Sequence, residues 1–136
     1  MSDKNRIGGT LSECRFHLAS VGILSAPLHL DKTFDYLVIS PLEVKRGDLV
    51  AVPFGGGNRP ETALVFNVYP MEDVGYEHQY KPVSRVLNRA FSLSDEAVAL
   101  VELLKERTFC TTGEAVRCIT PSAAFSKLEE YVREGR

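Results

Sequence analysis

Apolar and polar residues alternate with a period of two along much of the first 87 residues. Strand-like segments cover positions 16–24, 34–39, 49–54, 62–68 and 81–87. The clearest turn signal between them is the run Gly55-Gly56-Gly57-Asn58-Arg59-Pro60. Short strands joined by tight turns predict a small, mostly antiparallel β barrel or curled sheet over residues 16–87.

The period changes to that of an α-helix after this region. Ser94 is placed to cap a helix with one shared apolar face, formed by Ala97, Leu100, Val101 and Leu104. The run Thr111-Thr112-Gly113-Glu114 offers a capping box for a short helix that ends before Pro121. Strands followed by two to three helices predict an α+β fold.

The two ends of the chain carry weaker patterns. Residues 1–15 are polar and contain glycine, which predicts a flexible leader. A third helix is predicted from Ser122 onward, with Phe125, Leu128 and Val132 on one face. Because this apolar stripe needs something to pack against, we expect the chain to be a fragment of a longer protein.

The charge balance argues against a protein that coats DNA. The chain holds 16 Lys and Arg against 18 Asp and Glu, which gives a net charge of −2 and a pI near 5.9. Binding along a duplex neutralises many phosphates and usually requires a basic excess. A nucleic-acid ligand would therefore be read by a local pocket.

The cysteines and the first residues of the chain indicate the cellular compartment in which the protein is expected. Cys14, Cys110 and Cys118 form no CxxC pair, and the first residues lack the apolar core of an export signal. These features predict reduced thiols and a cytoplasmic protein. No apolar run approaches the ~20 residues of a membrane span, so no membrane partner is expected.

Motifs for catalysis or metal binding are missing from the sequence. The three histidines, His17, His29 and His78, lack metal-ligand spacing. The triple glycine at 55–57 lacks the lysine and the following helix of a phosphate-binding loop, which favours a flexible hairpin tip. We therefore expect no catalytic residue, metal ion or cofactor in this chain.

Asp35 is the most informative residue. It lies between Phe34 and Tyr36, and by the period of a strand it shares a face with Leu37 and Ile39. An acidic residue on an apolar face must be hydrogen-bonded or reached by solvent. Two interpretations stay open: a structural carboxylate that binds a loop amide, or an acceptor at a pocket rim where Phe34 or Tyr36 forms a stacking wall.

Lys81 and Gly55 are further candidates with two interpretations each. Lys81 precedes a proline and is either a solvated surface charge or a phosphate ligand. Gly55 either allows a positive φ or lets a ligand approach the backbone closely.

Several motifs together resemble the amino-terminal 3′ DNA-end-binding domain of the PriA family of primosomal replication-restart helicases. They are Pro27-Leu28, Thr33-Phe34-Asp35-Tyr36-Leu37, Val44-Lys45-Arg46-Gly47, Val50-Ala51-Val52-Pro53-Phe54-Gly55, Lys81 to Leu87, and Thr112-Gly113-Glu114-Ala115-Val116. The resemblance extends over about residues 18–121. The pair Phe-Asp-Tyr-Leu and Val-Pro-Phe-Gly, in this order and spacing, is its most specific part.

The resemblance implies a module that holds the 3′-OH terminal nucleotide of the nascent leading strand at stalled forks. Phe34, Asp35 and Tyr36 would belong to the nucleotide site, Gly55 would present backbone to it, and Lys81 would close it. The implied partners are DNA with a free 3′-OH end and forked DNA. Other primosome proteins and single-strand-binding protein would join through the full-length parent.

The resemblance also divides the chain. Residues 16–121 would form the DNA-end-binding domain, and residues 122–136 the first helix of a truncated winged-helix domain. ATP and zinc would belong to helicase segments outside this sequence, so the resemblance assigns no enzyme activity to this chain. The alternative function is a protein-interaction β barrel without a nucleic-acid site, in which Asp35 is purely structural.

Overall fold

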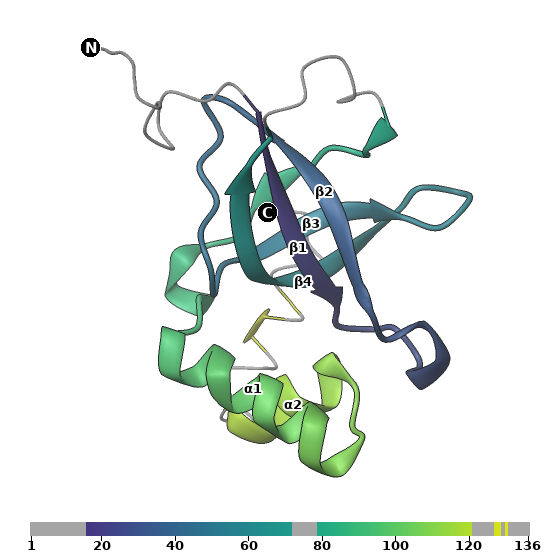
Figure 1. The fold of residues 1–136 in the computed structure, drawn as a ribbon, viewed down its shortest axis with the longest axis vertical. Coiled ribbons are helices and arrows are strands. Elements are labelled where there is room, and N and C mark those ends of the chain that lie inside the picture. The colour runs from purple at the N-terminus through teal and green to yellow at the C-terminus, as the bar shows by residue number, and fades with distance from the viewer. Residues whose placement is uncertain (1–15, 72–78, 121–126, 129, 131–136) are drawn as a thin grey trace.

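The computed structural model describes residues 16–71 and 79–120, together with 127, 128 and 130. Within this part, strands β1 to β4 are followed by a short strand and two α-helices (Figure 1). The elements are β1 (Phe16–Ile23), η2 (Leu28–Leu30), β2 (Thr33–Ile39), β3 (Leu49–Phe54), β4 (Arg59–Pro70), β5 (Arg85–Val86), η4 (Arg89–Phe91), α1 (Asp95–Thr108) and α2 (Thr112–Ile119). The expected α+β class and the order of elements are confirmed.

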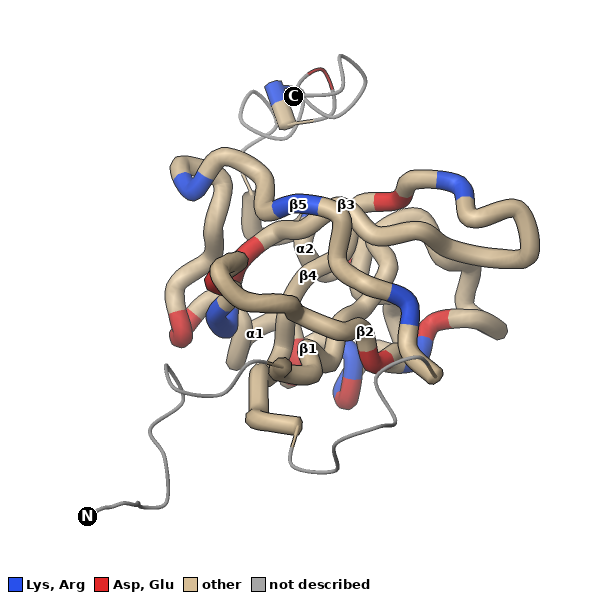
Figure 2. Tube along the Cα trace, turned by 90° about the horizontal axis from the view of Figure 1, so that it is seen from above, with Lys and Arg blue, Asp and Glu red and all other residues tan. Residues whose placement is uncertain are grey.

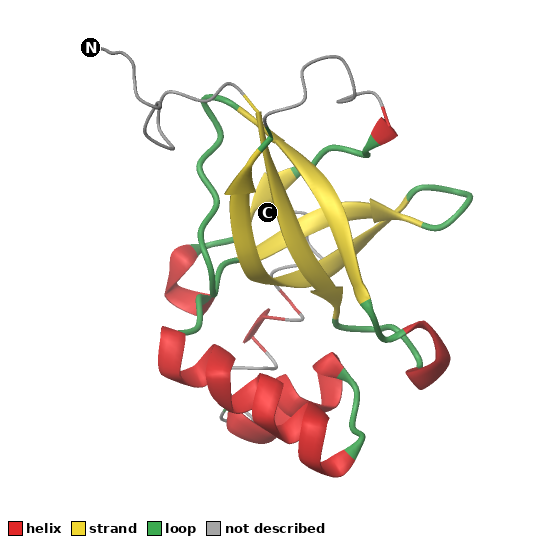
Figure 3. Cartoon of the chain, in the orientation of Figure 1, coloured by secondary structure: helices red, strands yellow, loops and turns green. Residues whose placement is uncertain are grey.

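The five strands form one antiparallel sheet in the order β2-β1-β4-β3-β5. The sheet curls, so that its two edges approach each other (Figure 3). The segment before β5 joins them: the Leu37 N–H donates to the Lys81 carbonyl, and the Val83 N–H donates to the Leu37 carbonyl, each at 2.8 Å. On its other side this segment pairs with β3. The result is a small barrel-like sheet, as predicted.

The closing strand is shorter than the sequence pattern predicts. Only Arg85 and Val86 form a ladder, although residues 81–87 alternate like a strand. Around Pro82 the chain instead makes an isolated parallel bridge to Leu37. Proline has no N–H to donate, so a regular ladder is interrupted there.

The core has two parts because β4 is covered on both faces. Alternate residues point into the barrel, where Ala19, Val21, Val50, Val52, Ala63 and Val65 pack together. The other β4 side chains, Leu64 and Phe66, pack against α1 and α2. Leu128 also joins this second cluster and is buried. The rest of the predicted third helix, including Ser122, Phe125 and Val132, lies outside the described residues.

The helix starts predicted at Ser94 and Thr111 are confirmed. The Ser94 hydroxyl accepts a hydrogen bond from the Ala97 N–H, and Thr111 with Glu114 makes a complete capping box. The predicted buried face of α1 is wrong at one position: Leu100 is 42% exposed. Val98 and Val101 are the fully buried residues of the helix, because the barrel meets α1 on the side that they share.

The junction between the barrel and the helices is tight. Asp31, in the loop that joins β1 to β2, has a side chain that is 3% exposed. Its carboxylate lies 3.1 Å from the Lys105 ammonium and accepts a 3.0 Å hydrogen bond from the Thr112 N–H at the start of α2. The β1–β2 loop, residues 24–32, is thereby fixed to both helices.

Candidate nucleic-acid interface

The residues singled out from the sequence converge on one cavity of about 480 Å³ at one end of the barrel. We call this cavity the aromatic pocket. Its lining consists of Leu30, Lys32, Phe34, Asp35, Tyr36, Phe54, Gly55, Gln79, Tyr80 and Lys81. The volume lies within the range of about 300–1,000 Å³ that is typical of small-ligand sites.

The curl of the sheet creates this pocket. β2 and β3 are not neighbours in the strand order, yet their ends meet around the barrel. There the rings of Phe34 and Phe54 pack edge to face, with centroids 5.2 Å apart and an interplanar angle of 76°. This arrangement is favourable for aromatic pairs, and it places an aromatic wall beside the cavity.

Asp35 lines this pocket from β2, and its side chain is exposed. As the period of a strand predicts, Asp35 shares its face with Leu37 and Ile39, whereas the alternate residues Phe34, Tyr36 and Val38 pack toward the barrel interior. The Asp35 carboxylate therefore needs no internal partner and is reached by solvent. This position agrees with an acceptor at a pocket rim.

Asp35 also faces a tyrosine of another strand. Burial raises the pKa of the Tyr69 phenol, and the hydrogen-bonded Asp35 carboxylate raises it further. Tyr69 belongs to β4, and its side chain is partly exposed. A carboxylate offers about four lone-pair sites, so Asp35 can accept this hydrogen bond and a second one from a ligand.

Lys81 and Gly55 both line the pocket and are in direct contact. The Lys81 ammonium donates a 2.9 Å hydrogen bond to the Gly55 carbonyl. One of its three N–H groups is used in this way, so the others remain suited to a phosphate or a sugar oxygen. Gly55 has φ +78°, and a Cβ at this position would meet no protein atom within 4 Å. Its backbone conformation favours glycine, and the space beside it is open.

Tyr36 differs from the other predicted residues because its side chain belongs to the core. It is 4% exposed, and its hydroxyl donates to the Pro53 carbonyl at 2.7 Å. Burial raises the pKa of this phenol. Of the two aromatic residues considered as a stacking wall, Phe34 is the more accessible to a ligand. Tyr36 packs in the core of the barrel next to the pocket.

Sequence reasoning did not select Phe54 or Lys32 as site residues. Phe54 follows Val50 and Val52 with a period of two and ends its strand, which is a signal for an inward residue at a barrel mouth. Lys32 carries no such signal. Its place depends on how the β1–β2 loop folds against the helices.

Residues 23–121 match the family model of the PriA 3′ DNA-binding domain (3′BD). The match covers well over half of the chain. The chain belongs to this family. No curated protein matches it.

The PriA 3′ DNA-binding domain is a DNA-binding module, and DNA is thus its partner. Charged residues of both signs are interspersed along the described trace (Figure 2). The pocket lining itself has two lysines and one aspartate. This distribution suits recognition at one place better than attraction over a broad surface.

Metal-ligating side chains do not cluster in the described part of the chain. No group of three or more His, Cys, Asp or Glu side chains among these residues is placed to hold a metal ion. Neither described α-helix is long and apolar enough to cross a lipid bilayer.

Proposed function

We propose that the aromatic pocket holds the 3′-terminal nucleotide of a DNA strand and that Asp35 accepts a hydrogen bond from its 3′-hydroxyl. The observation that carries this proposal is the convergence of Phe34, Asp35, Gly55 and Lys81 on one cavity in a domain that binds DNA. These residues come from three separate segments of the chain. Family membership favours this function over a protein-interaction barrel.

The base would stack on the aromatic wall. Stacking of a base on an aromatic side chain contributes about 1–3 kcal/mol and tolerates any base, because each base has a π face. Phe34 is only partly buried and holds a fixed orientation against Phe54. A pocket of this kind binds an unpaired nucleotide with little dependence on sequence.

The carboxylate would distinguish the chemical form of the strand end. A 3′-phosphate brings negative charge close to Asp35. At about 4 Å, two like charges repel by about 1 kcal/mol in water and about 4 kcal/mol near a protein surface. Because Asp35 is exposed, we expect the lower part of this range, equivalent to about 5- to 30-fold in affinity.

In the wider setting, the bound end would be that of a nascent leading strand at a stalled fork. The domain would then direct a full-length helicase of the family to this end. This part of the proposal is supported by the family alone.

Binding of labelled single strands that end in a 3′-hydroxyl or a 3′-phosphate tests the proposal by fluorescence anisotropy. The wild type should favour the hydroxyl by about 5- to 30-fold. Asp35→Asn keeps the size of the side chain and removes its charge, so this variant should lose most of the preference. Asp95→Asn, at an exposed carboxylate on α1, is the matched control and should keep it. Equal affinity of the wild type for both ends would refute the proposal.

A further inference from the structure

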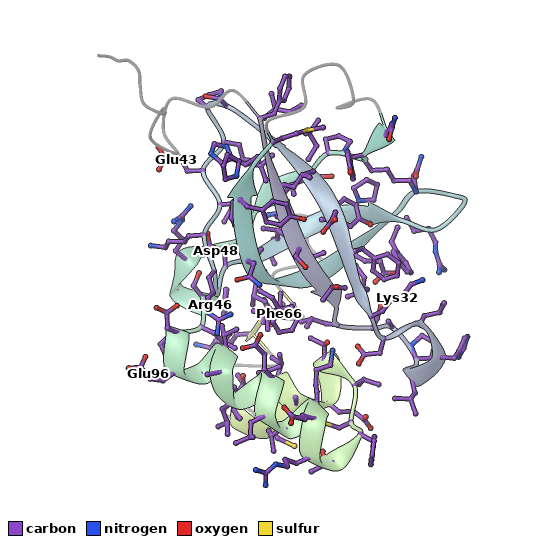
Figure 4. All side chains as sticks on the ribbon, viewed as in Figure 1. Lys32, Glu43, Arg46, Asp48, Phe66 and Glu96 are labelled. Atoms are coloured by element: carbon purple, nitrogen blue, oxygen red, sulfur yellow. The ribbon has the colours of Figure 1, made fainter. Side chains whose placement is uncertain are left out.

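Lys32 is a second positively charged residue in the aromatic pocket, on the wall formed by the β1–β2 loop. It is exposed, and its ammonium lies 5.4 Å from the centroid of the Phe34 ring. Figure 4 places Lys32 on the side of the barrel opposite to Glu43 and Arg46. Lys32 thus belongs to the same end of the barrel as Phe34 and Asp35.

The backbone at Lys32 has a fixed position. The preceding residue, Asp31, is tied to Lys105 and to the Thr112 N–H by its buried carboxylate. The following residue, Thr33, begins β2. The long side chain of Lys32 therefore extends from an anchored point, and its charged end can move between nearby partners.

The ammonium touches the same ring that the proposed function gives to the base. Phe54 already packs against Phe34 edge to face. A base that stacks on the ring where Lys32 lies must displace the ammonium. A cation–π interaction at such an exposed site is weak, whereas an ammonium and a phosphate form a charge-assisted hydrogen bond.

We propose that Lys32 binds the phosphodiester on the 5′ side of the terminal nucleotide when the base displaces it from Phe34. This inference rests on the proposed function. It assigns the pocket's charges separate roles, with Asp35 at the 3′-hydroxyl and Lys32 at the phosphodiester that joins the terminal nucleotide to the preceding one. Lys81 lies on another wall of the pocket, held at the Gly55 carbonyl.

The dependence of affinity on salt measures this interaction. In single-stranded DNA, each neutralised phosphate contributes about −0.7 to the slope of log K against log salt concentration. Lys32→Gln should weaken binding of a 3′-hydroxyl strand about fivefold and make the slope shallower by about 0.7. Lys45→Gln is the matched control, because Lys45 is an exposed lysine that lines a different cavity, beside Arg46. This control should leave both quantities unchanged.

A strand with a neutral methylphosphonate at its last linkage locates the interaction. The wild type should bind this strand about fivefold more weakly than the natural strand, and Lys32→Gln should bind both strands equally. The assignment would be overturned if the methylphosphonate weakened binding by Lys32→Gln as much as binding by the wild type. An unchanged salt slope in Lys32→Gln would also overturn it. If the wild type still prefers a 3′-hydroxyl end, only the role of Lys32 fails. If that preference is absent, the pocket proposal fails and the role of Lys32 with it.

Discussion

Gly113, in the first turn of α2, provides a sharp test of the junction between barrel and helices. It is buried, and a Cβ at this position would lie 1.9 Å from the Leu24 carbonyl oxygen. Leu24 directly follows β1 and leads into the loop that forms one wall of the aromatic pocket. Gly113→Ala therefore forces α2 and this backbone apart by about 1 Å, because a carbonyl in a close-packed segment cannot rotate away.

The expected cost follows from two opposing effects. Overpacking of a close-packed interior costs about 1–3 kcal/mol, and a clash with fixed backbone belongs at the upper end. Alanine is better than glycine in a helix by about 1 kcal/mol, which offsets part of this cost. We expect a net loss of about 2 kcal/mol in the free energy of unfolding.

Urea unfolding of the chain, followed by circular dichroism, measures this loss. With a slope of about 1.5 kcal/mol/M, the midpoint should fall by about 1.3 M. Gly57→Ala is the matched control, because a Cβ there meets no protein atom within 4 Å. It should change stability by no more than about 0.5 kcal/mol. Equal midpoints for the two variants would refute the close approach of α2 to Leu24.

Three further predictions concern the loop, the rim and the helix cap. Asp31→Ala removes the carboxylate that pairs with Lys105 and an acceptor for the first turn of α2, and should cost about 3 kcal/mol in urea unfolding; a cost below about 1 kcal/mol would contradict this anchor. Asp35→Asn should lower the pKa of Tyr69, although burial should hold it above its ordinary value; carbon-13 NMR titration would show this, and an unchanged pKa would exclude the interaction. Thr111→Ala removes the cap of α2 and should cost about 1 kcal/mol in unfolding free energy, with a cost near zero as the contrary result.

Local pattern was sufficient for most of the fold. β3 begins and ends at the predicted residues, and the caps at Ser94 and Thr111 are formed as predicted. Strand period, turn residues and caps are encoded within a few neighbouring positions. The same applies to the grouping of strands before helices.

The faces of the elements were harder to predict, because they depend on tertiary structure. Leu100 was placed on the wrong side of its helix by counting apolar neighbours, and the sequence did not show which face of β2 lines the barrel. β2 turns Phe34 and Tyr36 inward, and α1 turns Val98 toward the barrel. An element with apolar residues on two sides leaves this choice open until its partners are known.

The residues of the candidate site that lie in family motifs were predicted from the sequence. A residue that only the folded chain brings to the site was missed. Phe34, Asp35, Gly55 and Lys81 were named from the sequence, and the pocket brings them together. Lys32 lines the pocket from a loop whose neighbouring residue, Asp31, binds Lys105 and the Thr112 N–H. A long-range interaction of this kind leaves no local signal.

Backbone NMR during titration with a short 3′-hydroxyl oligonucleotide tests the central claim most directly. If the aromatic pocket holds the terminal nucleotide, the largest amide shift changes will fall at Phe34 to Tyr36, at Gly55 and at Lys81, and a 3′-phosphate will reduce them. Shift changes confined to the opposite end of the barrel, around His17 and Leu42, would contradict the account.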